Sequence, residues 1–278
     1  MGLGGHLTWT PVAREIIIQY KIKMGNFKIL PIENTTICNS PIFKNNPNFV
    51  FEKDSYPKFI LNFSDIKYHY GIPENNNSIM KWVSKKHMIH YISDQFNLNN
   101  VDLKCDLFFT NNEISFCLKL IDELPKTFIA IEPSSKQSFT ANKIYPYKKW
   151  QKIIDKLKNK LTFVQVGKKK SQLLDDVIDM RQNSFRECAC LISYSKFFVG
   201  LEGGLMHAAN SVNKRSVIVY TGWCPKEIWS YPDQKLVYVG GSHSPEGINT
   251  IYKPFYNEVQ KHNEDEIIEK ILEMDSET

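Results

Sequence analysis

The residues with the clearest capacity for chemistry lie in the stretch "FFVGLEGGLMHAAN", residues 197–210. A short apolar run ends at Glu202, and the glycines Gly203 and Gly204 follow where a strand would pass into a helix. Glycines at such a junction leave no side chain between the first helix amides and a ligand. Those amides and the positive end of the helix dipole favour a phosphate or diphosphate. The pattern therefore predicts an anion site, although a Gly-Gly pair can also be a simple connection.

Several charged or polar residues accompany this turn. Glu202 would repel a phosphate, so we expect it either to bind a sugar or ribose hydroxyl or to be solvated. His207, by itself, is more often a packed or capping histidine than a catalytic one. Lys143 lies in a loop at the start of the same half of the chain, where an ammonium could neutralise a phosphate. The lysines at 168–170 fit a solvated run better than an anion site.

A second glycine-rich segment, "MGLGGHLTWTP", opens the chain. We expect Gly2, Gly4 and Gly5 to form a loop before a helix that starts at Pro11 with Thr10 as its N-cap. The neighbouring His6 could accept a hydroxyl proton, because imidazole titrates near neutral pH. The alternative is a histidine that only contacts substrate or solvent.

The elements that must position these residues alternate between strand and helix after Pro125. Apolar, strand-like runs occupy residues 128–133, 161–167, 196–200 and 215–222. Helix-like runs occupy residues 147–160, 171–180, 185–195 and 203–212. This alternation predicts parallel βαβ units in a doubly wound sheet, which binds ligands at the carboxyl ends of its strands.

The first half of the chain is more mixed. It contains expected strands at 27–32, 49–52, 58–63 and 106–110, and expected helices at 10–24 and 77–97. A length of 278 residues exceeds that of most single domains. We therefore predict two Rossmann-like α/β domains with a central cleft, covering residues 1–125 and 126–278, the second ending in an amphipathic helix.

Composition narrows the class of protein. An apolar fraction of 42%, a charged fraction of 23% and a net charge of +5 are those of an ordinary globular protein. The six cysteines include no CxxC pair, so we expect reduced thiols and no metal cluster. There is no signal peptide and no apolar run of about 20 residues, so we expect a cytoplasmic protein with at most peripheral contact at the inner face of the membrane. The absence of a basic stripe with interleaved aromatics argues against nucleic-acid binding.

The second half resembles a known family. The order "FIAIEPSS…NKIYPYKKW", "FVQVG", "SKFFVGLEGGLMHAANSVNKRSVIVYTG" and "WSYP" is similar to the C-terminal domain of the bacterial heptosyltransferases. These are ADP-heptose-dependent glycosyltransferases with the two-domain GT-B architecture. The family has a lysine in a K-x-W/Y-P loop, matched by Lys143, and an acid–small–Gly–Leu–x–His turn. That turn is matched by Glu202, Gly203, Gly204, Leu205 and His207.

The resemblance implies a glycosyltransferase that moves a heptose or related sugar, with inversion, to a hydroxyl of a surface glycan or lipopolysaccharide. The C-terminal domain would hold an ADP-linked donor, with its diphosphate at the Gly203–Leu205 turn and Glu202 on the nucleotide side. No DxD-like acidic cluster follows a plausible strand end near this turn. We therefore expect no metal and no further cofactor.

The N-terminal segment departs from the family pattern. There a loop on the acceptor side carries glycine–aspartate followed by proline, and the aspartate is regarded as the general base. Its place here falls on Gly5, so we predict His6 as the base and Gly4 and Gly5 as the acceptor-side loop. A strand should precede this loop, so either the natural chain starts upstream of Met1 or the N-terminal domain lacks its first strand.

Other functions remain open at this point. The missing aspartate and strand favour, as the alternative, a catalytically impaired homologue that only binds nucleotide sugar or glycan. A nucleotide-sugar 2-epimerase of the same architecture would need more acid and base residues than the sequence supplies.

Overall fold

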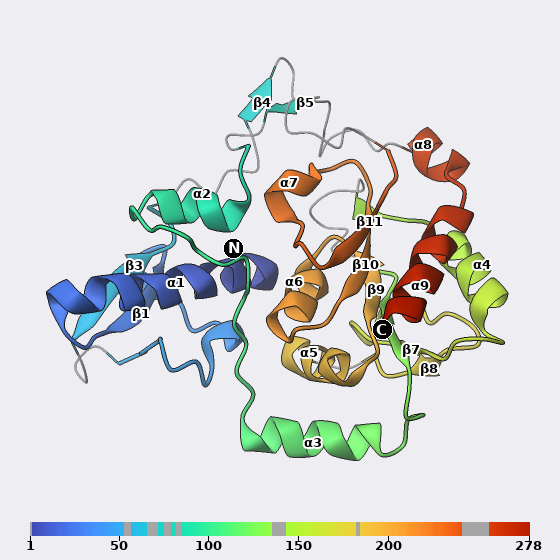
Figure 1. Cartoon of the computed structure of the whole chain (residues 1–278), viewed down its shortest axis with the longest axis horizontal. Coiled ribbons are helices and arrows are strands. Elements are labelled where there is room, and N and C mark those ends of the chain that lie inside the picture. Colours follow the sequence, from blue (N-terminus) through green and yellow to red (C-terminus); the bar gives the residue numbers. More distant parts are fainter. Residues whose placement is uncertain are drawn as a thin grey trace.

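The computed structural model describes residues 2–52, 57–65, 72–74, 79–81, 85–134, 143–181, 184–240 and 256–278. The N-terminal and C-terminal halves of the chain form two α/β units that lie side by side, as expected for two domains (Figure 1). Within the described residues, no helix combines the length and the apolar character that crossing a bilayer requires.

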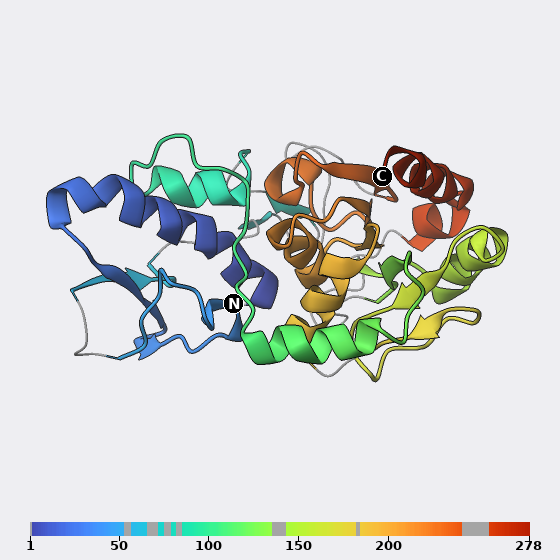
Figure 2. The same ribbon diagram turned by 60° about the horizontal axis from the view of Figure 1, so that its bottom comes forward.

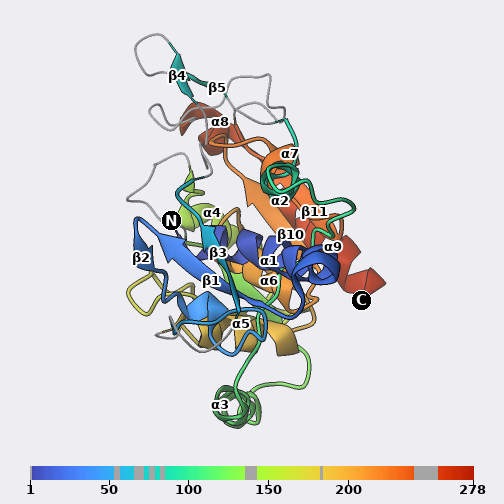
Figure 3. The ribbon, with the colours of Figure 1, turned by 90° about the vertical axis from the view of Figure 1, so that its left-hand side faces the viewer.

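The N-terminal half is built around a small sheet. Its elements are α1 (Leu3–Met24), β1 (Lys28–Glu33), β2 (Thr36–Ile37), the 3-10 helix η1 (Pro41–Phe43), β3 (Lys58–Asn62), β4 (Ile72–Glu74), β5 (Ile79–Lys81) and α2 (Met88–Asp94). Strand β1 pairs in parallel with β3 and antiparallel with β2, while β4 and β5 form a separate antiparallel pair (Figure 3).

Helix α1 begins eight residues earlier than predicted, so the expected loop before Pro11 is wrong. It starts at Leu3, and Pro11 lies inside it. Pro11 has no N–H to donate to the carbonyl of Leu7. That carbonyl instead accepts a hydrogen bond of 2.7 Å from the Thr10 hydroxyl. The helix continues through the proline because its apolar side chains are buried. Gly2, the residue described before α1, is its N-cap and belongs to no strand.

The C-terminal half contains the larger sheet. Its elements are α3 (Asn111–Ile121), β6 (Ile129–Glu132), α4 (Tyr147–Leu157), β7 (Phe163–Gln165), β8 (Ile178–Asp179), α5 (Phe185–Tyr194), β9 (Phe198–Leu201), α6 (Gly204–Ser211), β10 (Ser216–Tyr220), α7 (Lys226–Trp229), β11 (Gln234–Tyr238), α8 (Tyr256–Lys261) and α9 (Asp265–Glu277). The strands are parallel in the order β8-β7-β6-β9-β10-β11. Numbered along the chain, this is 3-2-1-4-5-6, the order of doubly wound nucleotide-binding sheets. The predicted fold class is confirmed.

Several local predictions are wrong. The expected helix at 171–180 is an irregular segment that ends in β8, and Asp176 adopts a left-handed φ of 58° that no α-helix accepts. Within 77–97, part of which lies outside the described residues, the helix starts only at Met88, because the His87 side chain accepts from the Ile89 amide and caps it. No ladder strand forms at 49–52 or 106–110; Phe49 makes a single bridge to Ile29.

The core has two layers separated by the large sheet. Side chains alternate along its strands: Phe198 and Ile218 join the core under α5 and α6, whereas Val199 and Val219 join the core under α4 and α9. The α5/α6 core is continuous with that of the N-terminal half. The start of α1 lies beside α6 in the ribbon (Figure 2). This packing brings the start of α1 against the start of α6, near the strand crossover between β6 and β9.

Candidate functional site

The turn after β9 lies at the point where the strand order reverses, the usual ligand position in such sheets. Glu202 follows the strand and is 5% exposed. Gly203 is the N-cap of α6, and no side chain caps this end of the helix. The first amides of α6 are therefore not used by a capping side chain, which is the arrangement that an anion site requires.

The two glycines of the turn have different roles. Gly203 has an extended backbone, and an added Cβ would meet only the Leu201 carbonyl oxygen, at 3.9 Å. At Gly204 an added Cβ would come within 3.1 Å of the Phe185 ring. Packing thus favours glycine at 204. At position 203 no protein atom would clash with the methyl group of an alanine.

Lys143 and Glu202, predicted separately from two loops, lie in contact. The Lys143 ammonium is 2.8 Å from Glu202 Oε2 and 4.0 Å from the centre of the Trp223 ring. The Trp223 indole N–H donates to the same carboxylate oxygen. The positive charge expected to face a phosphate is thus held at the turn by the acid expected on the nucleotide side. Trp223 was not predicted.

His207 belongs to a buried polar network. Its Nδ1 lies 2.6 Å from the Tyr231 hydroxyl, which is also 3.2 Å from Cys105 Sγ. Burial lowers the pKa of His207 to about 3, so the ring is neutral at physiological pH. The ring packs against the start of α1 near Gly4. Because its pKa is so low, it is unsuited to proton transfer near neutral pH.

Gly4 lies against this turn and not in a separate loop. A Cβ added to Gly4 would stand 2.8 Å from His207 Cδ2 and 3.2 Å from Gly204 Cα. The amino ends of α1 and α6 therefore meet, and neither helix has an acidic residue in its first turn. The loop predicted for Gly4 and Gly5 is instead part of helix α1, and Gly4 lies against the turn at Gly203–Gly204.

A further carboxyl group, Glu132, ends β6 on the other side of the crossover, and sequence reasoning missed it. Glu132 is half-buried, and its carboxyl lies against Gly167, where an added Cβ would stand 3.1 Å from Oε1. Burial raises the pKa of Glu132 to about 8, against the opposing effect of Lys168. A neutral carboxyl can donate as well as accept a hydrogen bond. The signal was the acid that closes the apolar run "FIAIE".

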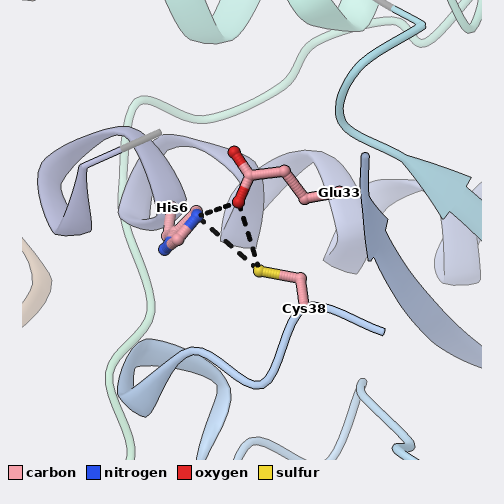
Figure 4. Close-up of side chains that lie close together, drawn as sticks. All are labelled: His6, Glu33 and Cys38. Atoms are coloured by element: carbon pink, nitrogen blue, oxygen red, sulfur yellow. Dashed lines mark hydrogen bonds and ion pairs between the residues drawn. The ribbon is translucent and has the colours of Figure 1, made fainter. Parts of the chain in front are cut away.

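His6, the predicted base, points away from Gly4, because residues two apart on a helix differ by about 200° in direction. Its Nε2 lies 3.4 Å from Glu33 Oε2 and 3.7 Å from Cys38 Sγ, and these two atoms are 3.8 Å apart (Figure 4). Its Nδ1 lies 2.8 Å from Ser40 Oγ. Burial lowers the pKa of His6, with Glu33 opposing the shift. The partners described for His6 thus all belong to the N-terminal half, and its role as base stays a prediction.

Solved structures share the fold. A glycosyltransferase of family 9 from Veillonella parvula aligns with a TM-score of 0.71 at 11% identity, over 100% of this chain and 96% of its own. The glycosyltransferase TibC from enterotoxigenic E. coli gives 0.69 at 12% identity, over 100% and 74%. The E. coli ADP-heptose lipopolysaccharide heptosyltransferase II gives 0.52 at 14% identity, over 68% and 62%. None of the curated proteins matched the sequence.

The expectation that no metal is involved is contradicted by two findings. TibC is described as iron-containing. In this chain His6, Glu33 and Cys38 form a cluster whose ligand atoms lie within 4.8 Å of one another. The sequence did not reveal this cluster, because its three residues are separated along the chain and follow no metal-ligand spacing.

The family is shown by the sequence itself. Residues 80–247, more than half of the chain, match the family profile described as "Glycosyltransferase family 9 (heptosyltransferase)". This range includes Lys143, Glu202 and the Gly203–Gly204 turn. The chain therefore belongs to glycosyltransferase family 9, the heptosyltransferase family, and is a glycosyltransferase.

Proposed function

We propose that the protein transfers a heptose or related sugar from an ADP-linked donor to a hydroxyl of a surface glycan or lipopolysaccharide, with inversion at the anomeric carbon. The observation that carries this proposal is the uncapped amino end of α6 at the strand crossover, beside Lys143 and Glu202. Two fold relatives support the choice of donor: TibC was solved in complex with ADP-D-β-D-heptose, and the E. coli enzyme is named for ADP-heptose.

The donor's diphosphate would sit at the Gly203–Leu205 turn. The positive ends of α1 and α6 approach each other there, as the contact between Gly4 and Gly204 indicates. Two such ends repel unless negative charge lies near them, and a diphosphate supplies it. Leu205 contributes its backbone amide, and His207 holds the turn through Tyr231.

Lys143 would exchange partners when the donor binds. Its ammonium would turn from Glu202 to the phosphates, and Glu202 would accept from a ribose hydroxyl while keeping the Trp223 indole N–H. As the sugar leaves, negative charge builds on the diphosphate, and the helix amides and Lys143 stabilise it. Glu132, at the neighbouring strand end, is a second group able to contact the nucleotide sugar.

On the acceptor side, His6 stays the proposed base for the attacking hydroxyl, and Gly5 lies beside it in the first turn of α1. A glycolipid acceptor would bring the protein to a membrane surface. The far end of α1 suits such peripheral contact, because Ile18 and Ile22 are 56% and 93% exposed there, with Lys21 and Lys23 between and beyond them.

The sharpest test of the donor site is Gly203→Ala. The chain has room for the methyl group, so we expect the melting temperature to stay within about 2 °C of the wild type, since no contact is lost. A methyl group would stand where the diphosphate approaches the amides, so we expect ADP and nucleotide-sugar affinity to fall at least tenfold in calorimetric titrations. Unchanged ADP affinity in a folded variant would contradict the proposed site.

The second candidate is a homologue that binds nucleotide sugar without transferring it. It is favoured by Gly5 at the expected aspartate position and by the engagement of both His6 ring nitrogens. Product formation with a panel of glycan acceptors separates the two candidates. Donor binding without product would support the second.

A further inference from the structure

We propose that His6, Glu33 and Cys38 form a binding site for a divalent transition metal, with Zn²⁺ the best chemical match. This inference does not depend on the proposed sugar transfer. The three side chains supply an imidazole nitrogen, a carboxylate oxygen and a sulfur, which together suit a borderline metal and not Mg²⁺ or Ca²⁺.

The spacing of the three atoms matches one face of a coordination tetrahedron. With metal–ligand bonds of about 2.0–2.3 Å, tetrahedral zinc separates its nitrogen and oxygen ligands by about 3.4 Å and sulfur from either by about 3.6 Å. The measured separations are 3.4 Å for His6 Nε2 to Glu33 Oε2, 3.7 Å for Nε2 to Cys38 Sγ, and 3.8 Å for Sγ to Oε2. A metal would fit with movements of a few tenths of an ångström.

Local structure explains why these residues meet. Strands β1 and β2 form a hairpin in which Glu33 pairs with Thr36, through a two-residue turn with positive φ at Asn34 and Thr35. Cys38 stands two residues beyond Thr36, so it shares a face of the hairpin with Glu33. Helix α1 crosses this face and directs His6 onto it (Figure 4).

The surroundings prepare His6 as a ligand. Its Nδ1 lies 2.8 Å from Ser40 Oγ, and this oxygen also accepts from the Ile42 amide, at 3.3 Å. A proton on Nδ1 donated to Ser40 leaves the Nε2 lone pair directed at Glu33 and Cys38, the usual outer-shell arrangement of a metal-bound histidine. The rings of Phe43 and Phe63, centred 5.6 and 6.0 Å from the imidazole, exclude water on that side.

Charge and access also fit. A thiolate and a carboxylate neutralise a divalent cation, which a partly buried site needs. The Glu33 side chain is 22% exposed and that of His6 only 8%, so Glu33 is the more accessible of these two ligands. Three protein ligands would leave a fourth position on a tetrahedral metal for water or another ligand. With Nδ1 donating to Ser40 and Nε2 bound to a metal, His6 would have no nitrogen left to accept a proton, so the metal site and the role of His6 as base are mutually exclusive.

The test measures metal content directly. Full-length protein is stripped with a chelator, exposed to Zn²⁺, Co²⁺ or, without oxygen, Fe²⁺, and dialysed; metal is then counted by mass spectrometry. We expect about one Zn²⁺ per chain, and for Co²⁺ a thiolate-to-cobalt absorption band. Cys38→Ser and Glu33→Gln should each lower zinc retention at least tenfold, and Cys38→Ser should abolish the band.

The matched control is Cys117→Ser, which removes a buried thiol that lies in α3, outside the cluster. This variant should retain the metal. Circular dichroism checks the fold of each variant, and the near-isosteric Glu33→Gln serves if Cys38→Ser does not fold. Iron retained in place of zinc and lost in both variants supports the site. Substoichiometric metal in the wild type, or equal retention in all variants, overturns it. ADP titration of the same samples reports separately on the donor site.

Discussion

The contact between Lys143 and Glu202 brings two opposite charges together beside the turn at Gly203–Gly204. Each side chain is nearly buried, with exposed fractions of 13% and 6%. A buried ion pair gains little stability, yet removing one partner leaves a costly unpaired charge. Under the proposed donor site, we interpret the pair as a charge held ready for a ligand and not as a fold-stabilising bridge.

Lys143→Met tests this explanation. A charge-assisted contact to phosphate contributes about 1.5–3 kcal/mol, so we expect ADP binding to weaken roughly 10–100-fold in calorimetry. The double variant Lys143→Met/Glu202→Gln is the control. If Lys143 only neutralises Glu202, the double variant recovers binding. If it binds phosphate, binding stays weak. Wild-type affinity in the single variant would contradict both roles.

At the scale of the elements, the meeting of α1 and α6 decides the geometry of the site. Gly4 allows the two amino ends to approach, because any larger residue would meet His207 and the backbone of Gly204. Glycine is otherwise a poor helix residue, less favourable than alanine by about 0.8–1.0 kcal/mol. Its presence inside the first turn of α1 is thus explained by close packing, and not by a loop.

Gly4→Ala should therefore destabilise the protein although alanine favours the helix. We expect the free energy of unfolding to fall by about 1–3 kcal/mol, as for other overpacked sites, measured by urea denaturation. Gly2→Ala is the control, since an added Cβ there has nothing within 4 Å. Its effect should stay below about 1 kcal/mol. Equal effects of the two substitutions would show that the helix contact is not tight.

Across the whole molecule, Arg186 joins three distant segments. From α5 it binds the Glu113 carboxylate of α3 at 2.7 and 2.8 Å, the Pro41 carbonyl at 2.9 Å and the Phe108 carbonyl. It is 4% exposed. Hydrogen bonding to the Arg186 guanidinium holds the pKa of the Glu113 carboxyl well below its usual 4.5, although partial burial of that carboxyl acts in the opposite direction. This bridge helps to fix the N-terminal half against the large sheet.

The bridge predicts an acid-dependent loss of stability. Since the pKa of Glu113 is lower in the folded protein, its contribution is complete above about pH 4.5 and is lost as the pH falls further. Glu113→Gln should lower the free energy of unfolding by about 1–3 kcal/mol at pH 7 and make it fall less steeply with decreasing pH. Urea denaturation between pH 3 and 7 measures both effects. Glu273→Gln removes an exposed ion-pair partner instead, and it should change neither the free energy of unfolding at pH 7 nor its decline in acid. An unaltered acid slope in Glu113→Gln would contradict this assignment.

Local sequence patterns predicted the C-terminal half well and the N-terminal half poorly. The strand before Glu202, the Gly-Gly helix start and the parallel sheet follow from short apolar runs buried on both faces, which leave little choice of structure. The segment at 171–180 has a helix-like pattern, but Asp176 turns the chain and Ile178 joins the sheet edge. At the N-terminus, glycine and proline signals indicated a loop, while burial of side chains such as Leu7 and Trp9 made a helix.

The sequence by itself determined the family, the fold class and the turn at Gly203–Gly204, because each depends on residues adjacent along the chain. Only the tertiary structure decided that Lys143 pairs with Glu202, that Gly4 faces Gly204, and that His6 meets Glu33 and Cys38. These contacts depend on how β1, α1 and α6 pack together. Packing responds to the shape and burial of many side chains at once, and a spacing pattern in one segment does not contain that information.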